Sequence, residues 1–81
     1  MGDIKMYGAA WCSDCIRARK VLERHRLDYE YIDIDVIAGA SQEAQDLANG
    51  RKNIPVIVLP DGRILVEPTD PELESALKSG S

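Results

Sequence analysis

The two cysteines of this chain, Cys12 and Cys15, stand where one side-chain periodicity gives way to another. Residues 3–8 alternate apolar and polar side chains, as strands do, whereas apolar residues from Ser13 to about Arg26 recur with helical spacing. The pair is therefore expected at the N-terminus of a helix, where residues three apart lie close enough to form a disulfide. Unpaired N–H groups and the positive end of the helix also favour a thiolate at Cys12, and a thiolate is the species that attacks disulfides.

The rest of the chain continues this alternation of strand and helix patterns. Three further strands are predicted at residues 29–36, 56–59 and 64–66, and two further helices at residues 41–49 and 70–78. The order β-α-β-α-β-β-α predicts an α/β fold, a four-stranded mixed sheet with helices on both faces. The strand at 56–59 is expected near the centre and the one at 64–66 at an edge. We expect one domain over residues 1–78 and a flexible tail at 79–81.

The same periodicities predict which side chains face the core. In the first helix the inward stripe is expected to comprise Cys15, Ala18, Val21, Leu22 and His25. In the second strand the inward set is expected to be Ile32, Ile34 and Val36. Gly50 is expected to end the second helix in a left-handed conformation, and Thr69 or Asp70 to cap the third.

Composition and charge argue against several classes of protein. The 81 residues carry a net charge of −4, which argues against a nucleic-acid or anionic-membrane partner. No apolar run approaches the roughly 20 residues of a spanning helix, and no signal peptide is readable. We therefore expect a cytoplasmic monomer. His25 and the two cysteines cannot supply the four ligands of a structural zinc site, so no bound metal is expected.

Three features together resemble the glutaredoxin family of the thioredoxin-fold superfamily. The first is Trp11 before the Cys-x-x-Cys pair, at the start of a helix. The second is the dipeptide Ile54-Pro55 before the third strand, and the third is a short hairpin followed by a C-terminal helix. Trp11 and the segment 67–72 are most similar to mycoredoxin-like, actinobacterial-type members.

This resemblance implies a role for each matching residue. Cys12 matches the family's nucleophile and is expected to be exposed, and Cys15 matches its resolving cysteine. Pro55 matches the family's cis-proline, and the backbone of Ile54 matches the segment that pairs with a substrate cysteine. Trp11 is expected to form a flat, exposed rim beside the sulfur of Cys12.

The resemblance also implies a site for a small thiol, in which this chain departs from the family. Lys52 falls where the family often has a basic residue, and Thr69 and Asp70 fall where it holds the γ-glutamyl end of glutathione. The family's Gly-Gly pair is replaced by residues 67–68, and a lysine three residues before the first cysteine is replaced by Ala9. Both departures weaken the case for glutathione as the thiol partner.

The dipeptide between the cysteines, Ser13-Asp14, also departs from the usual Pro-Tyr. A carboxylate in the first turn is favourable to the helix dipole, which is reason enough for Asp14 to stand there. The same negative charge lies two residues from Cys12 and disfavours a thiolate, so Asp14 and the helix are expected to act on Cys12 in opposite directions.

Two functions follow from these residues. The first is a thiol–disulfide oxidoreductase that uses Cys12 and Cys15 to reduce protein disulfides or mixed disulfides, with no bound cofactor. Its electron donor is expected to be mycothiol, glutathione or a thioredoxin reductase. The alternative is an iron–sulfur carrier in which Cys12 and an external thiol hold a cluster between two protomers, which the small Ser13 permits sterically. A third possibility, a structural domain with an inert bridge, predicts no turnover with any dithiol.

Overall fold

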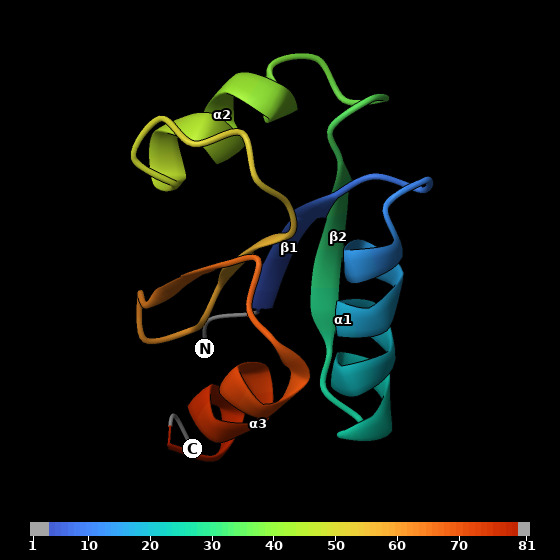
Figure 1. The fold of residues 1–81 in the computed structure, drawn as a ribbon, viewed down its shortest axis with the longest axis vertical. Helices are drawn as coiled ribbons and strands as arrows, with labels where there is room; N and C mark the ends of the chain where they lie inside the picture. Colours follow the sequence, from blue (N-terminus) through green and yellow to red (C-terminus); the bar gives the residue numbers. More distant parts are fainter. Residues whose placement is uncertain (1–3, 80–81) are drawn as a thin grey trace.

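The computed structural model, described for residues 4–79, has the element order predicted from the sequence (Figure 1). Its elements are β1 (Ile4–Gly8), α1 (Ser13–Arg24), β2 (Tyr29–Asp33), α2 (Ala40–Leu47), β3 (Val56–Val58), β4 (Ile64–Val66) and α3 (Asp70–Ser79). Of the tail expected at 79–81, residue 79 ends α3, and 80 and 81 lie outside the described residues, as does residue 3 of the expected first strand.

The four strands form one mixed sheet in the order β2-β1-β3-β4. β1 and β2 are parallel and are joined by α1, with Ile4 opposite Tyr29. β3 runs antiparallel to both neighbours, so that Ile57 lies opposite Met6 on one side and Leu65 on the other. The prediction of β3 in the interior and β4 at an edge is therefore confirmed.

Helices cover both faces of the sheet, as expected, and each face has its own core. On one face, α1 and α3 pack over a cluster that includes Met6, Cys15, Leu22 and Leu73. On the other face, α2 packs its Ala44 against a second cluster around Tyr7 and Val56. Figure 1 shows α2 on the opposite side of the strands from α1. The α1 stripe is buried as predicted except at its end, where His25 is only partly buried.

The second strand is shorter than predicted, and its expected inward set is wrong at Val36. β2 ends at Asp33, Ile34 is half-buried, and Val36 is 78% exposed. The reason is a turn at Asp33, whose carboxylate accepts the Asp35 N–H at 2.9 Å and whose carbonyl accepts the N–H groups of residues 36 and 37. The chain leaves the sheet there, so alternation no longer determines which side chains are buried.

Boundaries of three other elements also shift by one or two residues. α1 ends at Arg24 because Arg26 takes a left-handed backbone with φ 56°, and the Leu27 N–H then returns to the Leu22 carbonyl. α2 begins at Ala40 and ends at Leu47 rather than spanning 41–49. β3 ends at 58, one residue early. Gly50 has φ 88°, so its predicted left-handed conformation is confirmed.

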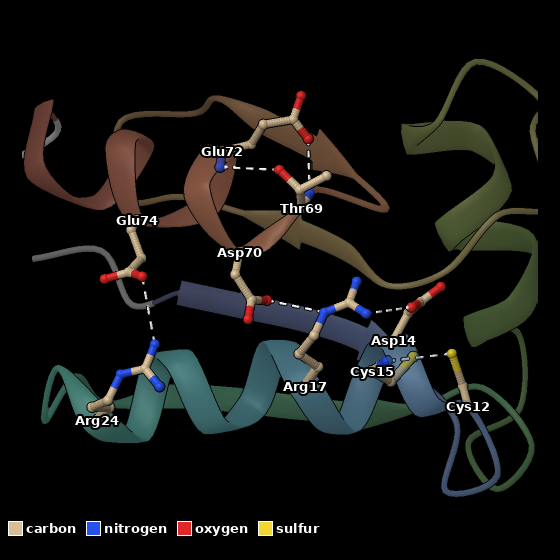
Figure 2. A network of polar contacts seen from close by, with 9 residues as sticks. All are labelled: Cys12, Asp14, Cys15, Arg17, Arg24, Thr69, Asp70, Glu72 and Glu74. Atoms are coloured by element: carbon tan, nitrogen blue, oxygen red, sulfur yellow. Dashed lines mark hydrogen bonds and ion pairs between the residues drawn. The ribbon is translucent and has the colours of Figure 1, made fainter.

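Thr69 is the cap of α3, in a reciprocal pair with Glu72. The Thr69 hydroxyl accepts the Glu72 N–H at 3.2 Å, and the Glu72 carboxylate accepts the Thr69 N–H at 2.7 Å, as Figure 2 shows. Asp70 is therefore free of the capping role and points toward α1. Within residues 4–79, no helix has the length and apolar character needed to cross a membrane.

Candidate active site

The backbone around Cys12 makes this residue the N-cap of α1. Its φ and ψ are −88° and 113°, which is extended backbone, and its carbonyl accepts the first helical bond from Ile16 at 3.1 Å. The Cys12 sulfur accepts the backbone N–H of Cys15 at 3.3 Å, which satisfies one of the free donors of the first turn (Figure 2). The N–H groups of the first turn and the positive end of the helix dipole point toward this sulfur.

The sulfur of Cys12 is less accessible than the sequence led us to expect. Cys12 is 9% exposed and belongs to the core cluster under α1, whereas the prediction was an exposed nucleophile. The cause is the segment before β3, since the Cys12 sulfur lies 4.0 Å from the carbonyl oxygen of Ile54. Only a small part of Cys12 is therefore accessible to a reactant. Both cysteines are free thiols in this structure.

Cys15 lies directly behind Cys12 and has no exposed surface. Burial raises the pKa of the Cys15 thiol to about 12, and the neighbouring Cys12 sulfur and the charge of Asp14 act in the same direction. A hydrogen bond with the backbone of Ala9 opposes this shift. Cys15 is therefore protonated at neutral pH and shielded from solvent.

Sequence analysis missed the part played by Gly8. A Cβ atom placed on Gly8 would lie 2.9 Å from the Cys15 sulfur, closer than such contacts allow, so the last residue of β1 has to be glycine for Cys15 to pack there. The signal was present in the sequence as a glycine at the end of a strand, four residues before Cys12. Nothing local, however, indicates that Cys15 is the neighbour that requires it.

The Ile54-Pro55 peptide bond is cis, as the resemblance implied. Pro55 is buried, while Ile54 is half-buried and places its carbonyl beside Cys12. Lys52 is exposed and lies on the other side of this segment, where it and Ile54 help to line a small cavity of about 80 Å³ against α2. The structure therefore brings the Ile54 carbonyl to the cysteine pair and places Lys52 at the cavity against α2.

Trp11 is 72% exposed, which confirms the predicted exposed position before Cys12. Its ring nitrogen donates a hydrogen bond to the Asp35 carboxylate at 2.7 Å. The contact ties the loop before α1 to the turn after β2 and fixes the orientation of the indole ring. An exposed indole ring is thus anchored to the turn after β2 at the position directly before Cys12.

Asp14 and Asp70 are joined through Arg17. The Arg17 Nη1 atom lies 3.0 Å from an Asp14 oxygen, and its Nε donates to an Asp70 oxygen at 3.0 Å. Figure 2 shows the guanidinium between the two carboxylates, one from α1 and one from α3. Spacing i,i+3 could have indicated the Asp14 contact, but not the one to Asp70. Thr69 points to Glu72 instead, so the expected thiol-binding pair is engaged within the chain.

Comparisons with known proteins agree with this geometry. A family model described as Glutaredoxin matches residues 4–65. A Mycobacterium tuberculosis protein whose name places it among the glutaredoxins is 26% identical over 74 residues, which cover 91% of this chain and 88% of that protein.

Solved structures give the same result. The crystal structure of a glutaredoxin from Archaeoglobus fulgidus superposes with a TM-score of 0.82 at 25% identity, covering 96% of this chain and 88% of the other. The glutaredoxin-like NrdH-redoxin of Escherichia coli shares the fold, with a TM-score of 0.77 at 20% identity and coverage of 91% and 93%. With the cysteine pair at the start of α1, these matches show that the chain belongs to the glutaredoxin family, whose members carry out thiol–disulfide exchange.

Proposed function

We propose that this chain is a dithiol oxidoreductase in which Cys12 attacks a disulfide and Cys15 completes the reduction. The observation that carries the proposal is the relation between the two sulfurs. Cys12 sits at the helix N-terminus, bonded to the Cys15 N–H, and keeps 9% of its surface exposed, while Cys15 behind it keeps none. An outer sulfur suited to a thiolate and an inner protonated thiol match the two roles.

The two cysteines supply both electrons of this reaction. The thiolate of Cys12 bonds to one substrate sulfur, and the other sulfur leaves with the electron pair of the broken S–S bond. Cys15 then gives up its proton, which ends on a departing substrate thiolate. The Cys15 sulfur bonds to the Cys12 sulfur and expels the second substrate thiolate. Two electrons pass from the dithiol to the substrate, which leaves a disulfide between Cys12 and Cys15.

The surroundings of Cys12 favour a protein disulfide, or a mixed disulfide with a small thiol, as the substrate. The Ile54 backbone, 4.0 Å from the Cys12 sulfur, is placed to align an incoming chain. The fixed indole of Trp11 offers that chain an apolar contact. We expect the protein to act as a monomer in the cytoplasm.

The electron donor that regenerates the dithiol remains one of three candidates, namely mycothiol, glutathione and a thioredoxin reductase. Two contacts count against glutathione. Asp70 is already paired with Arg17, and Thr69 is engaged in the cap of α3, so neither is free to receive a γ-glutamyl group. We therefore expect glutathione to be the poorest donor of the three.

A coupled assay tests both parts of the proposal. The oxidised protein is offered each donor with its NADPH-linked reductase, and NADPH loss is followed. The wild type should turn over with mycothiol or thioredoxin reductase, and Cys12→Ser should not turn over with any donor. Turnover by Cys12→Ser would contradict the assignment of Cys12, and a wild type that reacts only with glutathione would contradict the choice of donor.

An iron–sulfur carrier is the second candidate, and one structural neighbour favours it. That structure, titled as a study of metal binding by glutaredoxins, superposes with a TM-score of 0.58 at 26% identity over 99% of this chain and 83% of its own. Residues 4–79 bring no three His, Cys, Asp or Glu side chains together as metal ligands, so one chain alone does not fit a cluster. Cys12 from two copies and two external thiols would be needed. Visible absorbance after anaerobic purification would favour this function over the first.

A further inference from the structure

One buried polar atom of this protein has no partner. Among the described residues, the Tyr31 hydroxyl is the single buried side-chain oxygen or nitrogen without a hydrogen bond. Burying a hydroxyl without a partner is unfavourable, and most buried polar groups avoid it. The burial of the Tyr31 hydroxyl without a partner is therefore a feature to be explained.

Tyr31 lies on β2, on the face of the sheet that α1 covers, and packs against the cluster that contains both cysteines. The Arg19 guanidinium lies over its ring, 4.1 Å from the ring centre. A Cβ on Gly8 would stand 3.3 Å from the Cε1 atom of Tyr31 and 2.9 Å from the Cys15 sulfur. The Tyr31 ring edge that carries Cε1 therefore lies beside Gly8. The Cys15 sulfur lies beside the same residue.

The charges around Tyr31 keep its hydroxyl protonated. Burial raises the pKa of Tyr31, and negative charge on Asp33, Cys15 and Cys12 acts in the same direction, against the opposing effect of Arg19. The Asp33 carboxylate already accepts a backbone N–H, from the turn after β2. The hydroxyl is therefore a hydrogen-bond donor throughout the neutral range, and negative charge that develops on either cysteine acts on it.

We propose that the Tyr31 hydroxyl donates a hydrogen bond to the Cys15 sulfur while that sulfur is ionised and attacks Cys12. The inference rests on the function proposed above, in which Cys15 resolves the mixed disulfide. In the resting protein Cys15 is a protonated thiol and Tyr31 has no partner. A hydrogen bond that forms only when charge develops on Cys15 would lower the barrier of this step, because it stabilises the transition state more than the resting state.

Dithiobis(nitrobenzoate), an aromatic disulfide, separates the two steps in a stopped-flow experiment. The attack of Cys12 breaks the reagent's S–S bond and releases one coloured nitrothiobenzoate. The attack of Cys15 on the resulting mixed disulfide releases the second. The reduced wild type should therefore show two phases of colour, and Cys15→Ser only the first.

Tyr31→Phe removes the hydroxyl and keeps the ring beneath Arg19. We expect its first phase to match the wild type and its second to be slower by on the order of tenfold, the usual effect of losing one hydrogen bond to a charged group. Its thermal stability should not fall, because the hydroxyl has no partner in the resting protein.

Tyr29→Phe is the matched control. Tyr29 lies two residues away on β2, and its hydroxyl contacts Glu23 and Arg19 instead of the cysteines, so both of its phases should match the wild type. Unchanged phases in Tyr31→Phe, or an equal slowing of both, would overturn the inference. A wild type without a second phase would overturn the assigned role of Cys15, and the inference with it.

Discussion

The Nε atom of Arg17 donates to a carboxylate oxygen of Asp70 across a distance of 3.0 Å, and so joins α1 to the first turn of α3. The same guanidinium holds Asp14 at 3.0 Å, on the end of α1 that carries Cys12 (Figure 2). The carboxylate of Asp14 thus acts on the cysteine site with a cation beside it. The two residues expected to influence the sulfur and the incoming thiol are parts of one network.

Asp14→Asn should make the protein a stronger oxidant. The negative charge of Asp14 disfavours a thiolate at Cys12, so removing this charge stabilises the reduced form and raises the reduction potential. Because the side chains of Asp14 and Arg17 are partly exposed and Arg17 offsets the charge of Asp14, we expect the reduction potential to shift by only about 5–20 mV. Equilibration with a dithiol–disulfide buffer measures it, and the shift should shrink at high salt.

Glu74→Gln is the control for that substitution. Glu74 is also a carboxylate paired with an arginine, Arg24, but Figure 2 shows this pair at the far end of α1 from Cys12. Its potential should equal that of the wild type. An unchanged potential in Asp14→Asn would mean that Asp14 serves the helix dipole alone.

Cys15→Ser should trap mixed disulfides on Cys12, since the attack that releases them is lost. The adduct should be visible by mass spectrometry after incubation with a disulfide substrate, and activity toward small mixed disulfides should survive. Cys12→Ser should form no adduct. If Cys15→Ser lost every activity and trapped nothing, the two roles would be wrongly assigned.

Gly8→Ala should destabilise the protein by about 1–3 kcal/mol, the usual cost of overpacking a core. The added methyl group would lie 2.9 Å from the Cys15 sulfur, and Gly8 has no positive φ, so the cost is steric. Denaturant unfolding measures it. Cys15→Ala should relieve most of this loss in the double variant, and strictly additive losses would exclude this contact as the cause.

Thr69→Ala should remove the cap of α3 and cost about 1 kcal/mol of stability. The stability of Thr69→Ala should also depend less on pH in the acidic range than that of the wild type. The Thr69 backbone N–H, which alanine keeps, and the Thr69 side chain, which alanine lacks, both lower the pKa of Glu72 in the folded protein. Glu72 therefore contributes stability above its unfolded pKa that is lost as the pH falls through the lower, folded value, and Thr69→Ala should remove only the side-chain share of it.

Thermal midpoints of the wild type and Thr69→Ala, followed from neutral to acidic pH, test this dependence. The difference between the two proteins should narrow as the pH falls. Glu74, whose pKa is lowered chiefly by His25, keeps its own acid dependence in both proteins and serves as an internal control. A constant difference at all pH values would show that the Thr69 side chain has no effect on the ionisation of Glu72.

The element order, the faces of β1 and α1 and the cysteine pair at a helix N-terminus were predictable because they depend on neighbours within one or two turns. Thr69 as a cap belongs to the same class, since its partner is three residues away. The prediction was wrong where one side chain redirected the backbone, as at Asp33, whose turn leaves Val36 in solvent. Periodicity indicates a side chain's face only while the element continues.

The sequence by itself therefore determined the succession of strands and helices, the family and the residues that carry the chemistry. Tertiary structure alone decided how those residues are surrounded. The near-burial of Cys12 depends on Ile54, 42 residues away, and the charge beside it on Asp70, 53 residues from Arg17. Such contacts arise only when the sheet brings distant segments together, and no local pattern records which side chain will meet which.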